Sequence, residues 1–314
     1  MLRFVKPLFN RRSFLVSAAL AGATVLRPMR SFAIEPFQRS GPPRLRLSLA
    51  AYSFREYFKD SSHERETRVD EAKRIDLFRF IDFCADQGCE GAELTSYYFP
   101  KIVDHDFLLQ LRRHAFLRGV SISGTAVGNT FTHPPGNQRD AEIALVKRWT
   151  DYAAVLGAPH VRIFAGNAPQ GVSKEEAKKL CLAAVEECAD YAGRKGVLLG
   201  LENHGGIVAE ASDLLDIIRA VKSPWVGINL DTGNFHTDDP YADLTRCAPY
   251  AVNVQIKAEL RPRNQSEQKA DLPRLVRILR EANYQGWVAL EYESKEEPWK
   301  AVPGLIKQCR SVMT

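Results

Sequence analysis

Eight short apolar runs recur along the chain between residues 45 and 290, and charged or polar segments separate them. The runs lie at 45–54, 89–97, 120–127, 160–165, 197–201, 226–230, 251–256 and 287–290. Most are continuously apolar rather than alternating, which is typical of strands that are buried on both faces of a parallel sheet. The pattern therefore predicts eight parallel strands with helices packed against them.

Helical patterns lie between the apolar runs. The segments are 69–87, 138–156, 173–195, 208–222, 240–249, 271–284 and 298–312. Ser173 and Glu176 form a capping box at the start of one segment. Gly88, Gly157 and Gly196 follow the ends of three segments, where glycine commonly terminates a helix. These capping residues support the helical interpretation of the pattern.

The alternation of strands and helices predicts the fold class. Eight strands that alternate with helical segments in one chain indicate an α/β protein of one domain, a closed (β/α)8 TIM barrel, which typically needs ~250 residues. The sequence has no glycine-rich phosphate loop or dinucleotide fingerprint of an open doubly wound sheet. We expect the barrel at 44–314, preceded by an extended, proline-containing lead-in at 34–43.

Charge is uneven along the 314 residues, whose formal net charge is +5. The first 30 residues hold six basic residues and no acidic one, so the remainder carries about −1 (5 minus 6). The basic character therefore belongs to the N-terminus, and it does not predict a nucleic-acid partner.

Residues 1–33 have the organisation of an export signal. Arg11 and Arg12 precede Ser-Phe-Leu and an apolar stretch that ends at Leu26, and Ser31-Phe32-Ala33 offers small residues for cleavage. The segment resembles a twin-arginine signal, which predicts the twin-arginine export machinery as a partner and a periplasmic or extracytoplasmic location. The alternative is a membrane anchor, for which the apolar run is too short. We therefore expect no stable anchor.

Six cysteines follow the leader, at positions 84, 89, 181, 188, 247 and 309. Their spacing matches no metal motif, and most lie among apolar residues of predicted helices. Export would allow disulfides, but buried free thiols are the favoured interpretation.

Four side chains with oxygen donors lie at the ends of consecutive apolar runs. They are Glu202, Asp231, Gln255 and Glu291, separated by 29, 24 and 36 positions, which is about one strand and one helix each time. In a barrel such residues converge on one mouth. Three carboxylates and an amide would repel one another unless a cation lay among them, so the pattern predicts a divalent metal site. Salt bridges for the glutamates and a turn for Asp231 are the structural alternatives.

Other polar residues are placed near the same mouth. Lys257 shares a strand face with Gln255 and would need the carboxylates as counter-charge. His204 lies two residues after Glu202, and a purely structural hydrogen-bonding role is its alternative. Candidate substrate-binding residues are His204, Glu93, Tyr52 and Asn234.

The chain from about residue 44 resembles the xylose isomerase-like barrel family of sugar phosphate isomerases and epimerases. The motifs that carry the resemblance are LENHGG at 201–206, LDTGNF at 230–235, QIK at 255–257 and LEYE at 290–293. The resemblance implies that Glu202, Asp231 and Glu291 bind Mn²⁺ or Mg²⁺ and that the two glutamates also move the proton. Gln255 stands where the family has a histidine, which favours Mn²⁺, Mg²⁺ or Ca²⁺ over Zn²⁺.

The family also contains DNA-repair endonucleases with three zinc ions. They need a further histidine three residues after the aspartate, where this chain has Asn234. Because that ligand is missing, a DNA substrate is not expected.

These residues predict a metal-dependent isomerase or epimerase of a sugar or keto-sugar. Glu202 and Glu291 would act as acid and base, and Lys257 would help stabilise an enediolate. The main alternative is a metal-dependent lyase or hydrolase that cleaves a 3-keto-glycoside by β-elimination, and a non-catalytic sugar-binding barrel is a third. The expected partner is a small carbohydrate, and a homo-oligomer is compatible with the sequence.

Overall fold

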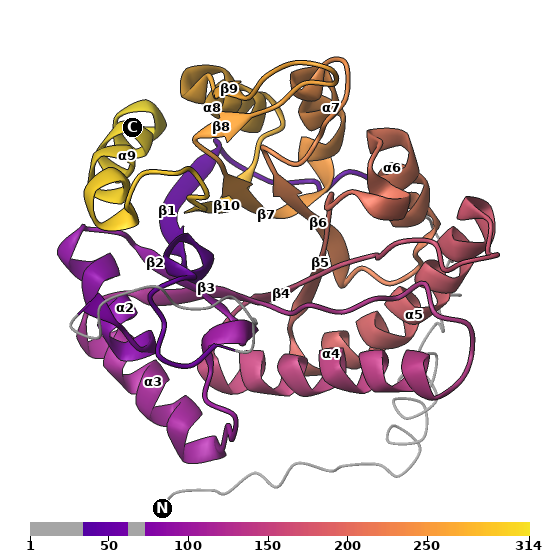
Figure 1. Cartoon of the computed structure of the whole chain (residues 1–314), viewed down its shortest axis with the longest axis horizontal. Coiled ribbons are helices and arrows are strands. Elements are labelled where there is room, and N and C mark those ends of the chain that lie inside the picture. The colour runs from indigo at the N-terminus through magenta and orange to yellow at the C-terminus, as the bar shows by residue number, and fades with distance from the viewer. Residues whose placement is uncertain (1–33, 62–72) are drawn as a thin grey trace, which may run out of the picture. The chain divides into compact units, whose positions relative to one another are not determined.

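A computed structural model describes residues 34–61 and 73–314. Eight parallel strands close into a barrel in the order β1-β10-β7-β6-β5-β4-β3-β2 (Figure 1). The barrel strands are β1 Arg44–Ala50, β2 Gly91–Thr95, β3 Ser121–Ala126, β4 His160–Ile163, β5 Leu198–Glu202, β6 Val226–Asp231, β7 Ala251–Ile256 and β10 Gln285–Leu290. All eight predicted strands are therefore present, and the predicted TIM barrel is confirmed.

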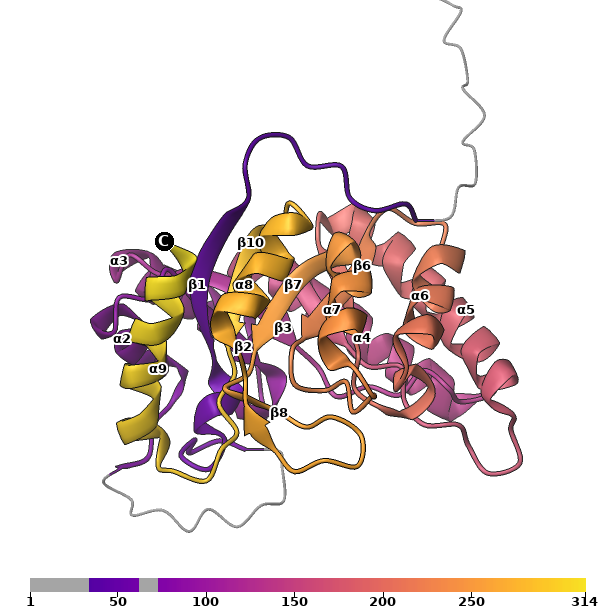
Figure 2. The ribbon, with the colours of Figure 1, turned by 90° about the horizontal axis from the view of Figure 1, so that it is seen from above.

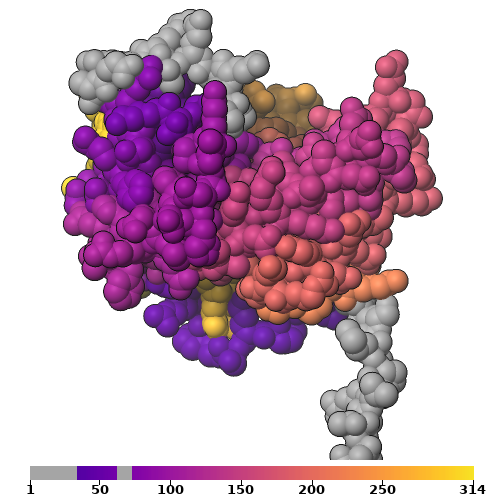
Figure 3. Space-filling model, turned by 90° about the horizontal axis from the view of Figure 1, so that it is seen from below, coloured from indigo at the N-terminus to yellow at the C-terminus, as the bar shows by residue number. Residues whose placement is uncertain are grey.

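Eight helices surround the strands in the described part of the chain (Figure 1). They are α2 Leu77–Asp86, α3 His105–Leu117, α4 Asn137–Leu156, α5 Lys174–Lys195, α6 Ala211–Ala220, α7 Pro240–Cys247, α8 Leu272–Glu281 and α9 Pro298–Met313. The space-filling view shows that the segments from α3 to α5 form a continuous outer wall (Figure 3). Seven helices match predicted segments within a few residues, apart from the start of the first, part of which lies outside the described residues.

Helix ends follow from local chemistry. The Ser173 side chain accepts a hydrogen bond from the Glu176 backbone N–H, as the capping box predicts. Gly157 and Gly196 take left-handed conformations with φ of 76° and 70°, which glycine adopts without steric cost. These caps fix where the helices stop, and so where each chain segment returns to the barrel.

The helix α3 was not among the predicted segments. Its buried residues are Leu108, Leu111 and Ala115, but Phe116 is 80% exposed and Leu117 63% exposed. Apolar residues on the solvent side blur the helical period, which is why the pattern did not stand out.

The core fills the space between strands and helices, where residues such as Leu49, Val161, Leu199, Val254 and Val288 are fully buried. All six cysteines are buried and free, as expected. Burial raises the pKa of the Cys181 and Cys309 thiols to about 12, so they stay protonated at neutral pH.

The two ends of the barrel differ. The lead-in at 34–43 crosses the end where strands begin, and the Phe37 N–H donates to the Pro249 carbonyl just before β7 (Figure 2). At the opposite end, the loop after β7 folds into the antiparallel pair β8 Glu259–Leu260 and β9 Gln268–Lys269, which the sequence did not predict. That second end holds the carboxyl termini of all barrel strands.

The predicted export signal at 1–33 lies outside the described residues. No helix within 34–61 and 73–314 is long and apolar enough to cross a membrane.

Candidate active site

The four strand-end residues are all buried, at the end of the barrel where the strands finish. Glu202 and Asp231 are the last residues of β5 and β6, Gln255 lies in β7, and Glu291 follows β10 directly. Parallel strands end on one face of a barrel, which is why residues far apart in sequence meet there. The structure then separates them into three different environments.

Glu202 is held by a guanidinium, an amide and an imidazole. Its Oε2 lies 3.0 Å from Arg162 Nε, and its Oε1 accepts from Asn234 Nδ2 at 2.9 Å and lies 2.9 Å from His204 Nδ1. Burial opposes ionisation of Glu202, but the charge of Arg162 and the contact with His204 outweigh it and lower its pKa. The carboxylate is therefore ionised at neutral pH.

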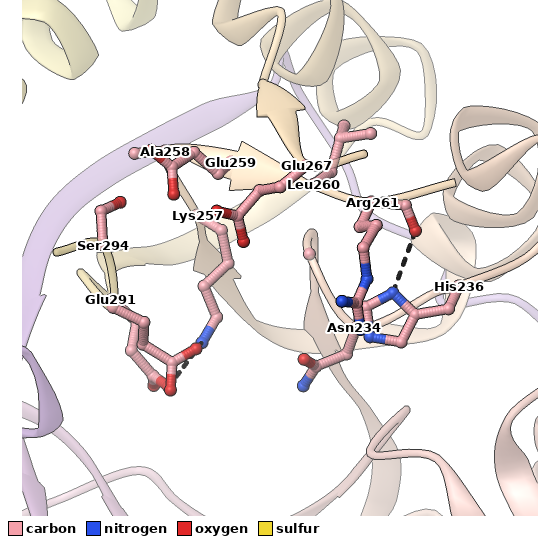
Figure 4. A pocket seen from close by; sticks show the side chains of 12 residues that line it. Asn234, His236, Lys257, Ala258, Glu259, Leu260, Arg261, Glu267, Glu291 and Ser294 are labelled. Carbon is pink, nitrogen blue, oxygen red and sulfur yellow. Dashed lines mark hydrogen bonds and ion pairs between the residues drawn. The ribbon is translucent and has the colours of Figure 1, made fainter. Parts of the chain in front are cut away.

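A second group, here called the mouth cluster, consists of Asp231, Lys257, Glu291 and Glu293. The Lys257 ammonium lies 2.8 Å from Glu291 Oε1 and 3.3 Å from Asp231 Oδ2, and it also donates a hydrogen bond to Glu293. Figure 4 shows the Lys257 side chain pointing at Glu291. Lys257 thus receives the carboxylate counter-charge that its position in the sequence requires.

One ammonium faces three carboxylates in the mouth cluster, and the pKa values reflect this. Burial raises the pKa of Glu291 to about 8, with Lys257 opposing the shift and Asp231 and Glu293 adding to it. Burial also raises the pKa of Asp231 to about 6. The pKa of Lys257 lies well above its usual range, because the carboxylates outweigh the cost of burying the charge.

A third group, here called the interior amide layer, lies inside the barrel and consists of Glu93, Asn229, Asn253 and Gln255. Both Glu93 oxygens accept amide hydrogen bonds at 2.7 Å, one from Asn253 Nδ2 and one from Gln255 Nε2. Asn229 Nδ2 donates to Gln255 Oε1 at 2.7 Å and lies 3.5 Å from Glu202 Oε2. The layer therefore joins the barrel interior to Glu202.

The predicted substrate-binding residues fall into different places. His204 is exposed, and its ring centroid lies 4.3 Å from that of Phe164. Tyr52 is half-buried in the 3-10 turn that directly follows the end of β1, as its predicted place near that strand end requires. Asn234 lines a cavity and contacts Glu202. Glu93 is fully buried with both oxygens taken by amides, so this geometry does not support substrate contact.

Several site residues were missed by the sequence reasoning. Arg162 was one, although a basic residue within an apolar run was visible at 160–165. Asn229 and Asn253 lie two residues before Asp231 and Gln255, so strand periodicity places each pair on one face. That spacing could have identified them.

The mouth cluster borders a cavity of about 230 Å³. Its walls include Asn234, His236, Arg261, Glu291 and Glu293 (Figure 4). Drug-sized ligands usually occupy ~300–1,000 Å³ of mostly apolar pocket. A smaller cavity lined mainly by charged and polar groups suits a small, strongly hydrogen-bonding molecule.

The predicted Mn²⁺ or Mg²⁺ ligands do not form a ligand set as they lie. Among residues 34–61 and 73–314, no group of three or more His, Cys, Asp or Glu side chains could hold a metal ion. The ammonium of Lys257 lies between Asp231 and Glu291, and the Gln255 amide is hydrogen-bonded at both ends. The metal site stays a prediction that this arrangement does not fit.

Two curated proteins are similar in sequence. The 2-oxo-tetronate isomerase of Haemophilus influenzae is 26% identical over 171 residues, which cover 51% of this chain and 64%, just under two thirds, of that protein. The putative hydroxypyruvate isomerase of Homo sapiens is 25% identical over 238 residues, covering 66% of this chain and 82% of that protein. Both are named as isomerases.

Structural and family comparisons agree with the barrel. A xylose isomerase-like TIM barrel protein from Mycobacterium smegmatis, solved in complex with magnesium, has a TM-score of 0.66 and 18% identity, covering 87% of this chain and 96% of that one. The family model for the xylose isomerase-like TIM barrel matches residues 81–309, well over half of the sequence. With eight parallel strands and buried glutamates ending β5 and following β10, the chain belongs to the xylose isomerase-like TIM barrel family.

Proposed function

We propose that the protein is an isomerase or epimerase of a small sugar or keto-acid and that it moves a proton between Glu202 and Glu291 by way of an enediolate. The observation that carries the proposal is a pair of buried glutamates at one end of the barrel, Glu202 at the end of β5 and Glu291 just after β10, and their pKa values are displaced in opposite directions. When the pKa values of two carboxyl groups differ in this way, one can act as a base and the other as an acid at the same pH. The named isomerases among its relatives support the same class of reaction.

Each residue then has a stated task. Glu202, kept ionised by Arg162, takes the proton from the carbon next to the substrate carbonyl. Glu291, whose pKa is raised to about 8, holds a proton at neutral pH and delivers it to the neighbouring carbon for isomerisation or to the opposite face for epimerisation. In the isomerisation the hydroxyl proton also passes to the former carbonyl oxygen, which completes the exchange of carbonyl and hydroxyl groups. The Lys257 ammonium, 2.8 Å from Glu291, stabilises the negative oxygen of the enediolate.

The substrate class follows from the cavity and its charges. A volume of about 230 Å³ suits a small molecule. Arg261 and His236 line the rim opposite Lys257 and offer donors to a carboxylate or hydroxyl group of the substrate (Figure 4). Hydroxypyruvate and 2-oxo-tetronate, after which the two relatives are named, are therefore the first compounds to test, followed by keto-hexoses.

A second candidate is a lyase that expels a leaving group from a 3-keto-glycoside. The observation that favours it is the Arg11-Arg12 leader, because an exported enzyme meets glycosides more readily than cytoplasmic metabolites. The first half of the reaction is the same: Glu202 removes the proton beside the ketone. The electron pair then forms a C=C bond, and the leaving group departs with the electrons of its own bond and takes the proton of Glu291.

One experiment separates these outcomes. The purified protein is incubated with a panel of hydroxypyruvate, 2-oxo-tetronate, keto-hexoses and 3-keto-glycosides in D₂O, and the products are followed by NMR. Isomerisation or epimerisation places solvent deuterium at one carbon of an intact sugar, whereas elimination releases the aglycone. If neither deuterium nor aglycone appears with any substrate, while a Glu202→Gln control behaves identically, the proposed function is wrong.

A further inference from the structure

The ammonium of Lys257 occupies the centre of the carboxylates at the barrel mouth. Its nitrogen contacts oxygens from Asp231 on β6 and from Glu291 and Glu293 in the segment after β10. Only 6% of Lys257 is exposed, so water cannot replace these partners easily. The position between three carboxylates is the one that a divalent cation would need.

We propose that the Lys257 ammonium replaces the divalent cation, so that the protein works without a bound metal ion. This inference rests on the proposed function, because it names the group that stabilises the enediolate. The resemblance of the sequence motifs, and a similar barrel solved in complex with magnesium, lead to the opposite expectation.

The other two expected ligands, Glu202 and Gln255, also have other partners in place of a metal ion. Glu202 faces Arg162 at 3.0 Å and accepts from Asn234 at 2.9 Å, so its charge is already balanced. The Gln255 amide donates to Glu93 and accepts from Asn229, both at 2.7 Å. Each of the four predicted ligands therefore already has a hydrogen-bond partner or a counter-charge within the protein.

The balance of charges at the site is a second argument against a bound divalent cation. Glu202, Asp231 and Glu291 bring up to three negative charges, and Arg162 and Lys257 lie within 3.3 Å of them with two positive ones. A divalent cation bound to the same carboxylates would lie close to the buried ammonium, and repulsion between them would oppose binding. Either the ammonium or the metal can hold the position, but both together are disfavoured.

The Lys257 ammonium can also stabilise the negative oxygen of the enediolate. A lysine has three N–H donors, and hydrogen bonds to Glu291 and Glu293 use two of them. Within the described part of the chain, the third N–H is left without a hydrogen bond. The nearest further oxygen is Asp231 Oδ2, 3.3 Å from the Lys257 nitrogen, and that oxygen has no hydrogen-bond partner among the described residues. A substrate oxygen can take that third donor. The C–H proton moves to Glu202, the C–H electron pair forms the C=C bond of the enediolate, the π pair of the carbonyl moves to its oxygen, and Lys257 stays protonated throughout.

The test measures metal binding directly. Wild-type protein, Lys257→Met and a surface control, Lys222→Met, are dialysed against EDTA, returned to metal-free buffer and titrated with Mn²⁺ by electron paramagnetic resonance. We expect no stoichiometric Mn²⁺ in the wild type or the control. Lys257→Met, shown to be folded by circular dichroism, should gain one bound Mn²⁺ per chain, because Asp231, Glu291 and Glu293 lose the ammonium that lies between them.

Opposite results overturn the inference. One Mn²⁺ per wild-type chain would do so whether or not Lys257→Met folds, and so would a folded Lys257→Met that binds none. Deuterium exchange gives an independent readout: the wild type should exchange equally with and without EDTA, and loss in EDTA with recovery in Mn²⁺ contradicts the inference. If no substrate exchanges at all, the proposed function fails, whereas the Mn²⁺ titration still decides the role of Lys257.

Discussion

Two groups of buried carboxylates lie in the same barrel and are held in opposite ways. In the interior amide layer, Glu93 accepts hydrogen bonds at 2.7 Å from the neutral amides of Asn253 and Gln255. In the mouth cluster, Glu291 faces the charged ammonium of Lys257 at 2.8 Å. The interior therefore relies on neutral directional donors and the mouth relies on charge.

The difference separates support from chemistry. Amide donors keep their protons at every physiological pH and point in fixed directions, so they hold the barrel interior in one geometry. An ammonium on a flexible four-carbon stem can exchange one oxygen partner for another. The mouth cluster can thus accept a substrate oxygen, while the interior amide layer keeps Asn229 in place beneath Glu202.

The largest expected effect concerns the proposed acid and base at the mouth. Glu202→Gln and Glu291→Gln keep the side-chain shape but remove the proton-transfer group, so turnover should fall by ~10²–10⁴. The rate is measured on whichever substrate exchanges in D₂O. Glu175→Gln, on the exposed face of α5, is the matched control and should leave it unchanged.

The two glutamate variants also differ in what they retain. If the proton is removed by one glutamate and returned by the other, one variant should still exchange substrate hydrogen with solvent without forming product. Wild-type turnover in both folded variants would show that neither is the base.

The next effect concerns the interior. Glu93→Leu removes the acceptor of two buried amide donors, and each stranded donor should cost about 1–3 kcal/mol of unfolding free energy. Glu93→Gln keeps one acceptor oxygen and should cost less. Urea unfolding measures both, and Glu90→Gln, at an exposed ion pair with Arg46, should change stability by less than about 0.5 kcal/mol. Equal losses at Glu90 and Glu93 would contradict a structural role for the interior amide layer.

The sequence predicted the parts of this comparison that depend on local pattern. Continuous apolar runs identified all eight strands, and the residues that end them identified Glu202, Asp231 and Glu291. The counter-charge of Lys257 followed from its strand face, and the contact with Glu291 agrees with it.

The rest depends on contacts across the barrel. Gln255 looked like a metal ligand at its strand end, but it donates to Glu93, 162 positions away in the sequence. The stagger of the strands decides which residues meet inside a closed barrel. The apolar pattern of a single strand carries no information about that stagger. Arg162 was missed for the same reason, because its partner lies on the neighbouring strand β5.

pH should distinguish the two regions. The pKa of Glu291 is raised from its usual 4.5 to about 8, so the folded protein keeps a proton that the unfolded chain releases. This contribution to stability is complete below about 4.5 and is lost as pH rises through about 8. Urea midpoints should therefore fall between pH 5 and pH 9. Glu291→Gln cannot titrate, so its midpoints should fall less, and an equal slope in both proteins would refute the assignment.

The smallest expected effect compares one glycine from each region. At Gly124 an added Cβ would lie 2.0 Å from the ring of buried His160, whereas at Gly233 the nearest atom is Lys257 Cγ at 2.8 Å. Gly124→Ala overpacks a rigid interior and should cost about 1–3 kcal/mol. Gly233→Ala meets the stem of a flexible side chain, so it should cost less stability but lower turnover by displacing the ammonium. Adding His160→Ser to Gly124→Ala should recover part of the loss, since it removes the ring that the new methyl meets. Urea unfolding of the single and double variants measures this coupling. If the losses of unfolding free energy are strictly additive, the new methyl group does not clash with His160 and the interior is not more rigid than the mouth.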